Sequence, residues 1–119
     1  MSSQRVRRVN EALRAILAER LTELADPRLG MVTITEVRAT PDLQRAEVFY
    51  TVLPDDEETR ASTAEALDSA VGRLRWHVGA EMRLKRVPTL HFTEDPVPAH
   101  GRRIDDLIEE TKAQRDDDA

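Results

Sequence analysis

The stretch VTITEV at residues 32–37, continued after a short turn by DLQRAEVFY at residues 42–50, decides the fold of this chain. Both segments mix β-branched and aromatic residues with polar ones, which predicts two strands joined by a turn. Alternate residues of a strand share one face. The face that we expect helices to cover carries Ala46, Val48, Tyr50 and Val52. On the opposite face Phe49 is either a stacking platform for a base or, as we prefer, capped by a neighbouring loop or strand.

An amphipathic helix precedes the two strands. Between residues 6 and 24 apolar residues recur at spacings of three and four, which places them on one stripe. They are Val6, Val9, Leu13, Ile16, Leu17, Leu21 and Leu24. Arg20 lies beside the stripe, where its stem would cover the edge of the core. The helix should end before Asp26-Pro27, because a residue preceding proline is pushed out of helical geometry. Gly30 then lets the chain turn into the first strand.

A second helical region follows an acidic linker at residues 54–58. The sequence STAE at residues 62–65 resembles a capping box, and apolar residues follow it at helical spacing up to Met82. We expect one long helix or two nearly collinear ones. Gly72 and Gly79 interrupt this pattern on the same predicted face. A kink, close approach by a partner's backbone, or simple tolerance would each account for them.

A third strand begins at Val87-Pro88 and continues through Phe92, since proline is tolerated at the first residue of a strand. The predicted domain therefore covers residues 1–95. Residues 96–119 are expected to form a separate C-terminal segment, with a short helix and then an acidic disordered tail.

Composition argues against several classes of function. The chain has 119 residues and no cysteine, and His77, His91 and His100 lie in different predicted elements without metal-ligand spacing. No nucleophile has a paired base. No apolar run reaches the length of a membrane span, and the N-terminus lacks the apolar stretch of a secretory signal. We expect a monomeric cytoplasmic protein that is not an enzyme, with no cofactor, metal, small-molecule substrate or membrane partner.

Charge is distributed unevenly along the chain. The net charge of −5 argues against a nucleic-acid partner, but the acids gather at residues 55–58 and in the C-terminal segment. Residues 1–20 and 69–86 are basic instead. The residues that we expect to contact RNA are Arg5, Arg7, Arg8, Arg73, Arg75, Trp76, Arg83, Lys85 and Arg86. Two alternatives stay open. The arginines can be ordinary solvated helix surface, and Trp76 can pack against the chain's own C-terminal segment.

Several motifs, taken in order, resemble the ribosome-binding factor A family of bacteria over most of residues 4–108. They are DPRL at 26–29, VTITEV at 32–37, DL at 42–43 with AEV at 46–48, AVG at 70–72, RLK at 83–85 with VP at 87–88, and LHF at 90–92. The resemblance implies an α+β fold, a single type II KH-like domain of order α-β-β-α-α-β whose three-stranded sheet is covered by helices. It also implies that Ala70, Val71 and Gly72 form a kink between two helices, in place of the Gly-x-x-Gly loop of ordinary KH domains.

The same resemblance implies a function. Members of the family bind the free small ribosomal subunit and its 16S rRNA, assist late rRNA maturation, matter at low temperature and leave before or with completion of the subunit. This chain departs from the family pattern at Lys85, where arginine is usual, and at Thr89, where glutamate is usual. Lysine keeps the charge but loses the two-pronged contact that arginine makes with phosphate.

The mechanism that we hypothesise is binding without catalysis. The basic helix faces would dock on rRNA phosphates and favour an immature RNA conformation over the mature one. One rival is a protein-interaction module that uses the same helices on the ribosome without touching RNA, which RNA crosslinking would distinguish. Another is a nuclease, but metal-assisted cleavage needs carboxylates gathered at one site, and the acids here lie in a linker and a tail.

Overall fold

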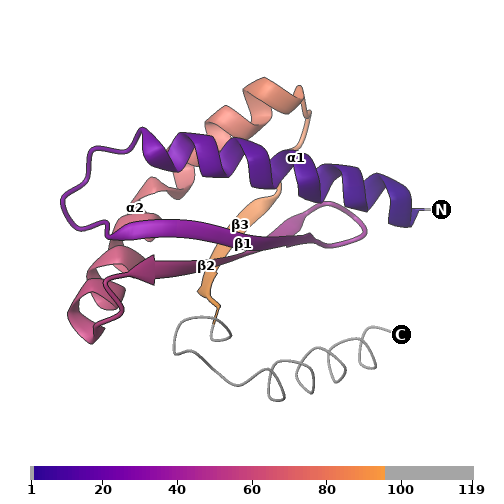
Figure 1. The fold of residues 1–119 in the computed structure, drawn as a ribbon. Helices are drawn as coiled ribbons and strands as arrows, with labels where there is room; N and C mark the ends of the chain where they lie inside the picture. The colour runs from indigo at the N-terminus through magenta and orange to yellow at the C-terminus, as the bar shows by residue number, and fades with distance from the viewer. Residues whose placement is uncertain (1, 96–119) are drawn as a thin grey trace, which may run out of the picture.

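The computed structural model describes residues 2–95, in which two helices pack on a three-stranded sheet (Figure 1). The elements are α1 (Ser2–Thr22), β1 (Met31–Ala39), β2 (Arg45–Leu53), α2 (Glu57–Met82) and β3 (Thr89–Glu94). The central strand is β2, which pairs with β1 in antiparallel and with β3 in parallel orientation. A parallel pair needs a crossover connection, and α2 provides it. The expected α+β class and three-stranded sheet are confirmed, whereas the C-terminal segment at 96–119 lies outside the described residues.

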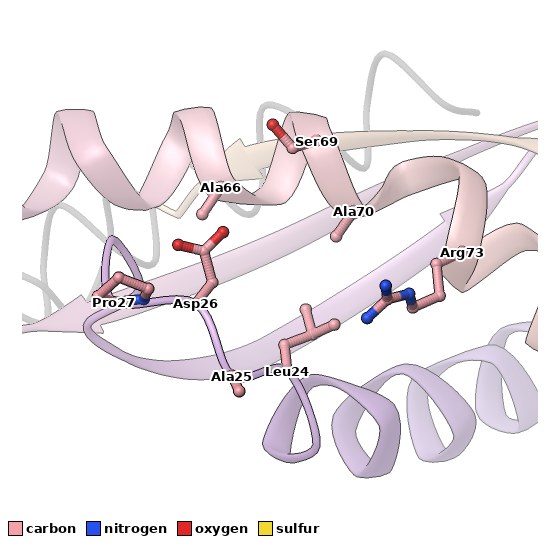
Figure 2. A pocket seen from close by; sticks show the side chains of 8 residues that line it. All are labelled: Leu24, Ala25, Asp26, Pro27, Ala66, Ser69, Ala70 and Arg73. Carbon is pink, nitrogen blue, oxygen red and sulfur yellow. The ribbon is translucent and has the colours of Figure 1, made fainter.

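In place of the two helices expected on either side of residues 70–72, the structure has one helix. This helix, α2, runs from Glu57 to Met82, and its ribbon changes direction near Ala70 (Figure 2). A Cβ atom built on Gly72 would meet nothing within 4 Å. Packing inside the domain therefore does not require glycine at position 72.

The core lies between the helices and one face of the sheet. Ala46, Val48, Tyr50 and Val52 alternate along β2 and are all buried, as expected. The helices cover them with leucine and valine side chains. These are Leu13, Leu17 and Leu21 from α1, and Leu67, Leu74 and Val78 from α2. Because residues two apart share a face, the residues between them lie on the other side of β2, away from α1 and α2.

A register shift in β1 adjusts the hairpin to this core. Ile34 pairs with Tyr50, but Glu36 rather than Thr35 pairs with Phe49. Such a bulge adds one residue to one strand and reverses the faces beyond it. Ile34 and Val37 are consequently both buried, although they are three residues apart.

The beginning of α2 differs from the prediction. Asp56 is the N-cap, and its carboxylate accepts a hydrogen bond from the Thr59 N–H at 2.7 Å. The capping box expected at 62–65 is wrong, because these residues already lie inside the helix. Their hydroxyls bind the loop before β1 instead. Ser62 Oγ donates to the Arg28 carbonyl at 2.8 Å, and Thr63 Oγ1 accepts from the Gly30 N–H at 3.0 Å.

Gly30 lies just before β1, where the chain passes close to both α2 and the end of β2. A Cβ atom at this position would be 2.7 Å from Thr59 Cγ2, 2.7 Å from Val52 Cγ2 and 2.8 Å from the Leu53 carbonyl oxygen. Real Cβ atoms essentially never approach other heavy atoms this closely. Close packing therefore requires glycine at position 30, in addition to the turn that the sequence predicted.

The face of the sheet opposite the helices carries polar and charged side chains around Phe49. The Arg38 guanidinium lies 5.7 Å from the centre of the Phe49 ring, a distance typical of a cation–π contact. Arg45 pairs with Glu47 at 2.7 Å on the same strand as Phe49. Arg38 belongs to the neighbouring strand β1, and its side chain lies over part of the half-buried Phe49 ring; the preferred interpretation, capping by a loop or strand, stays a prediction.

Candidate nucleic-acid interface

The second half of α2 presents a small, aromatic and basic stripe to solvent. Gly72, Arg73, Trp76 and Ala80 follow each other at spacings of one, three and four residues, and all four are exposed. Trp76 is 69% exposed and touches only its neighbour His77 among the described rings, with ring centres 5.1 Å apart. An indole held this openly can stack on a base.

The structure separates the cations of residues 4–95 into those that it pairs and those that it leaves unpaired. Hydrogen bonds or ion pairs engage Arg20, Arg28, Arg38, Arg45, Arg60 and Arg75. The side chains of the other cations form no hydrogen bond or ion pair with the described residues. They are Arg5, Arg7, Arg8, Arg14, Arg73, Arg83, Lys85 and Arg86. Apart from Arg14, these unpaired cations all belong to the set that the sequence predicted to contact RNA.

Arg75 is the member of the predicted set that the fold uses internally. Its Nε donates to the Pro88 carbonyl at 3.1 Å, and its NH2 group donates to the Val87 carbonyl at 2.9 Å. The side chain is half-buried and ties α2 to the segment that leads into β3. Arg75 therefore positions the segment that carries Lys85 and Arg86, which are both exposed.

The C-terminal end of α2 has an unusual cap. Arg83 adopts the left-handed conformation, with φ 54° and ψ 42°, and its N–H binds the Gly79 carbonyl. The Leu84 N–H binds the same oxygen at 3.2 Å. A Cβ atom on Gly79 would lie 2.8 Å from Val87 Cγ2. Gly72 and Gly79 therefore differ in their surroundings, because the segment after α2 folds back over Gly79, whereas a Cβ atom on Gly72 would meet nothing within 4 Å.

We call Arg73, Trp76, Arg83, Lys85 and Arg86 the α2 basic surface. Glu81 is the acidic residue within residues 73–86. It is engaged by Arg20 of α1, whose Nε lies 2.7 Å from Glu81 Oε2. Hydrogen bonds with Glu81 and Glu23 raise the pKa of Arg20. The same contact holds α1 against α2, so Arg20 has a structural role beyond the expected cover of the core edge.

The N-terminal arginines Arg5, Arg7 and Arg8 form a second surface. This part of α1 lies beside the end of β1, where Asn10 Oδ1 accepts a hydrogen bond from the Ala39 N–H at 2.7 Å. The contact between α1 and α2 lies farther along, at Arg20. An α-helix rises 1.5 Å per residue, which puts Arg8 about 18 Å from Arg20 along the axis. Arg8 therefore lies far from the point where Arg20 ties α1 to α2.

A pocket of about 460 Å³ opens beside the α2 basic surface (Figure 2). It lies between the loop after α1 and the middle of α2, and sequence reasoning did not find it. Its lining residues are Leu24, Ala25, Asp26, Pro27, Ala66, Ser69, Ala70 and Arg73. Only the tertiary structure brings the two segments together, since about 40 residues of chain separate them. We call it the Asp26 pocket.

The carboxylate of Asp26 is held in place by Arg28. Oδ1 accepts from the Arg28 backbone N–H at 2.9 Å and from Nε at 3.1 Å, and Oδ2 accepts from the NH2 group at 2.8 Å. The side-chain hydrogen bonds and then the backbone hydrogen bond lower the pKa of the Asp26 carboxyl below its usual range. Asp26 is therefore an oriented, ionised acceptor at neutral pH.

Within residues 2–95, no group of three or more histidine and acidic side chains is placed to hold a metal ion. None of the helices described here is long and apolar enough to span a bilayer.

Fold and surface together define a class, a small α+β domain that presents unpaired cations and an exposed tryptophan on one helix and the segment after it. Cations with an exposed aromatic side chain are the residue types that phosphate- and base-binding surfaces use. The model of the family "Ribosome-binding factor A" matches residues 5–108. The ribosome-binding factor A of Streptomyces griseus is 46% identical over 111 residues, which cover 92% of this chain and 70% of that protein. This chain belongs to the ribosome-binding factor A family.

Solved structures agree with this assignment. The crystal structure of ribosome-binding factor A from Thermus thermophilus has a TM-score of 0.66 and 29% identity, over 75% of this chain and 94% of that one. A homology model of the T. thermophilus protein, fitted into a cryo-EM map of a 30S complex with that factor, has a TM-score of 0.59 and 30% identity. That match covers 69% of this chain and 86% of the other.

Proposed function

We propose that this protein is a ribosome assembly factor, which binds the free small ribosomal subunit and assists late 16S rRNA maturation without catalysing a reaction. Family membership supports the proposal, as does the relative from T. thermophilus that was fitted into a 30S complex. The observation that carries it is the α2 basic surface, whose cations have no hydrogen-bond or ion-pair partner among the described residues and share α2 and the segment after it with a tryptophan that is 69% exposed.

Unpaired cations are suited to phosphate for an energetic reason. An arginine already bonded to a carboxylate must lose that bond before it meets a phosphate, whereas Arg73, Arg83, Lys85 and Arg86 have no such bond to lose. Each phosphate that they neutralise releases condensed counterions, which makes the affinity depend on salt. Trp76 would add stacking on an unpaired base, worth about 1–3 kcal/mol.

The two basic surfaces would act at different places on the subunit. The N-terminal arginines lie at the far end of α1, so they would contact a stretch of RNA separate from the one under α2. A binder that touches two stretches favours the conformation in which both are correctly spaced. We propose that this conformation belongs to the immature subunit and that the factor leaves when maturation changes the spacing.

Co-sedimentation tests the proposal. Purified protein is centrifuged with isolated small subunits, large subunits and intact ribosomes over a series of salt concentrations. We expect salt-sensitive binding to free small subunits alone. If the folded protein binds none of them at low salt, the proposal is wrong. If it binds small subunits equally at all salt concentrations, and RNA crosslinking yields no product, the partner is a ribosomal protein instead.

A further inference from the structure

The Asp26 pocket is open to solvent next to the α2 basic surface, and the function proposed above does not use it. Its walls are mainly small or apolar: Ala25, Pro27, Ala66 and Ala70, with Leu24 between them. The polar groups lie apart, Asp26 on the loop and Arg73 on the helix (Figure 2). A volume of about 460 Å³ lies within the range of small-ligand sites.

The two charged groups differ in what they can bind. Asp26 is ionised and oriented by Arg28, so it accepts hydrogen bonds and donates none. Arg73 has no hydrogen-bond or ion-pair partner among the described residues, and Figure 2 shows its guanidinium turned toward the pocket. A ligand that suits both carries donor groups at one end and negative charge at the other.

A nucleotide has this arrangement, and the geometry points to the Asp26 pocket as a subsite for one unpaired RNA nucleotide with a guanine base. The base would lie between Pro27 and Ala70 with its Watson–Crick edge toward Asp26, while Arg73 binds an adjacent phosphate. This inference rests on the proposed function, because it names what part of the RNA the factor selects.

Guanine fits Asp26 better than uracil for a chemical reason. The Watson–Crick edge of guanine has two neighbouring donors, N1–H and the N2 amino group. Arg28 uses both lone pairs of Asp26 Oδ1 but only one of Oδ2, so Oδ2 can accept a hydrogen bond from one of these donors. Uracil has one donor, N3–H, between two carbonyl oxygens that the carboxylate repels. A hydrogen bond to a charged acceptor, set against repulsion between that acceptor and two carbonyl oxygens, discriminates between bases by about tenfold or more.

The helix next to the pocket allows an RNA backbone to come close. Gly72 has open space where a Cβ atom would be, and Arg73 and Trp76 are exposed on either side of that space. A strand that places its base in the pocket would therefore pass over Gly72 toward the remaining cations of the α2 basic surface. The same path joins the pocket to the proposed rRNA contact.

The test is a titration of the full-length ¹⁵N-labelled protein with the pentaribonucleotides UUGUU and UUUUU, followed by amide chemical shifts. We expect UUGUU to bind about tenfold more tightly. Its largest shifts should fall on Leu24, Asp26, Ala66, Ser69 and Ala70. Equal affinities for the two pentamers, or shifts confined to Trp76 and residues 83–86, would overturn the inference.

Two variants separate the pocket from general RNA binding. Ala70→Leu fills the pocket. Asp26→Asn keeps the size of the side chain but replaces one acceptor oxygen of the carboxylate with an amide donor. Each should bring the two pentamers to within about twofold of each other, while binding of UUUUU persists. Thermal unfolding shows whether each variant is folded, and Asp26→Asn remains decisive if Ala70→Leu does not fold. Arg14→Gln, which removes an unpaired cation elsewhere, should leave the discrimination intact.

The outcomes distinguish the inference from the proposed function. If both folded variants still prefer UUGUU, the pocket does not read the base and the inference is wrong. If wild-type protein sediments with small subunits but shows no preference between the pentamers, the inference alone fails. If it sediments with no ribosomal particle, the proposed function fails, whatever the pentamers show.

Discussion

Replacing Arg73, Arg83 and Lys85 together with glutamine removes three unpaired cations from the α2 basic surface while leaving the packing of α2 unchanged. All three side chains are exposed and none has a partner among the described residues. Surface substitutions of this kind usually change the free energy of unfolding by less than about 0.5 kcal/mol. The expected effect is therefore on RNA binding rather than on folding.

The size of the effect follows from counterion release. Each phosphate contact contributes about 0.7 to 0.9 to the slope of log K against log salt. Loss of three contacts should reduce the slope for small-subunit binding by about 2.5. Between 50 and 200 mM salt, the wild type should then lose about 30-fold more affinity than the triple variant.

The assay is co-sedimentation with isolated small subunits at five or more salt concentrations, with the slope as the readout. The matched control replaces Arg14, Arg38 and Arg45 with glutamine, which removes the same charge from α1 and from the open face of the sheet. Because the net charge of the two variants is equal, a difference in slope between them reports the location of the contact and not the charge of the protein.

Two results would refute the reasoning. If the triple variant keeps the wild-type slope, the α2 basic surface does not bind phosphate. If the control variant loses as much slope as the test variant, binding depends on overall charge, and the location of the cations on the α2 basic surface has no functional meaning.

Five other substitutions have effects that the structure specifies. Arg75→Gln removes hydrogen bonds to two carbonyls and should lower the free energy of unfolding by about 2 kcal/mol, measured in urea, with little change in the salt slope of the single variant. Gly30→Ala should destabilise by about 3 kcal/mol through overpacking, whereas Gly72→Ala should stabilise by up to about 1 kcal/mol. A destabilised Gly72→Ala would contradict the open helical environment at that residue. Arg83→Gly relieves the left-handed backbone and should stabilise by about 1 kcal/mol in thermal unfolding while it weakens subunit binding. Asp56→Ala should be less stable than wild type at pH 7, because the hydrogen bond from the Thr59 N–H lowers the pKa of the Asp56 carboxyl in the folded state. That contribution is present above the unfolded pKa of about 3.9 and disappears as the pH falls through the folded value, so the two proteins should converge in urea unfolding near pH 2.

The elements of the fold followed from local sequence patterns. Alternation along residues 46–52 fixed the buried face of β2, and helical spacing of apolar residues fixed the stripe of α1. Patterns of this kind depend on residues two to four positions apart, which the chain itself holds in a known geometry. The start of α2 was misjudged, since a serine or threonine followed by an acid three residues later occurs inside helices as well as at their ends. Thr63 is in fact buried, where its hydroxyl binds Gly30.

Part of the candidate surface also followed from local sequence patterns. Basic windows are visible in a sequence, and within residues 4–95 every unpaired cation except Arg14 came from the predicted set. A sequence does not show which cation will find an acceptor. Arg75 and the Val87 carbonyl are 12 residues apart and meet because the chain reverses after α2.

By itself, the sequence determined the class of fold, the strands and helices, the family, and the windows in which the charge lies. The tertiary structure alone decided which cations stay unpaired, that Arg20 on α1 binds Glu81 on α2 across 61 residues of chain, and that a pocket forms between Asp26 and Arg73. The physical reason is the range of the interactions. Hydrophobic periodicity acts between near neighbours in the chain, whereas the pairing of charges and the shape of a pocket depend on residues that only folding brings within contact distance.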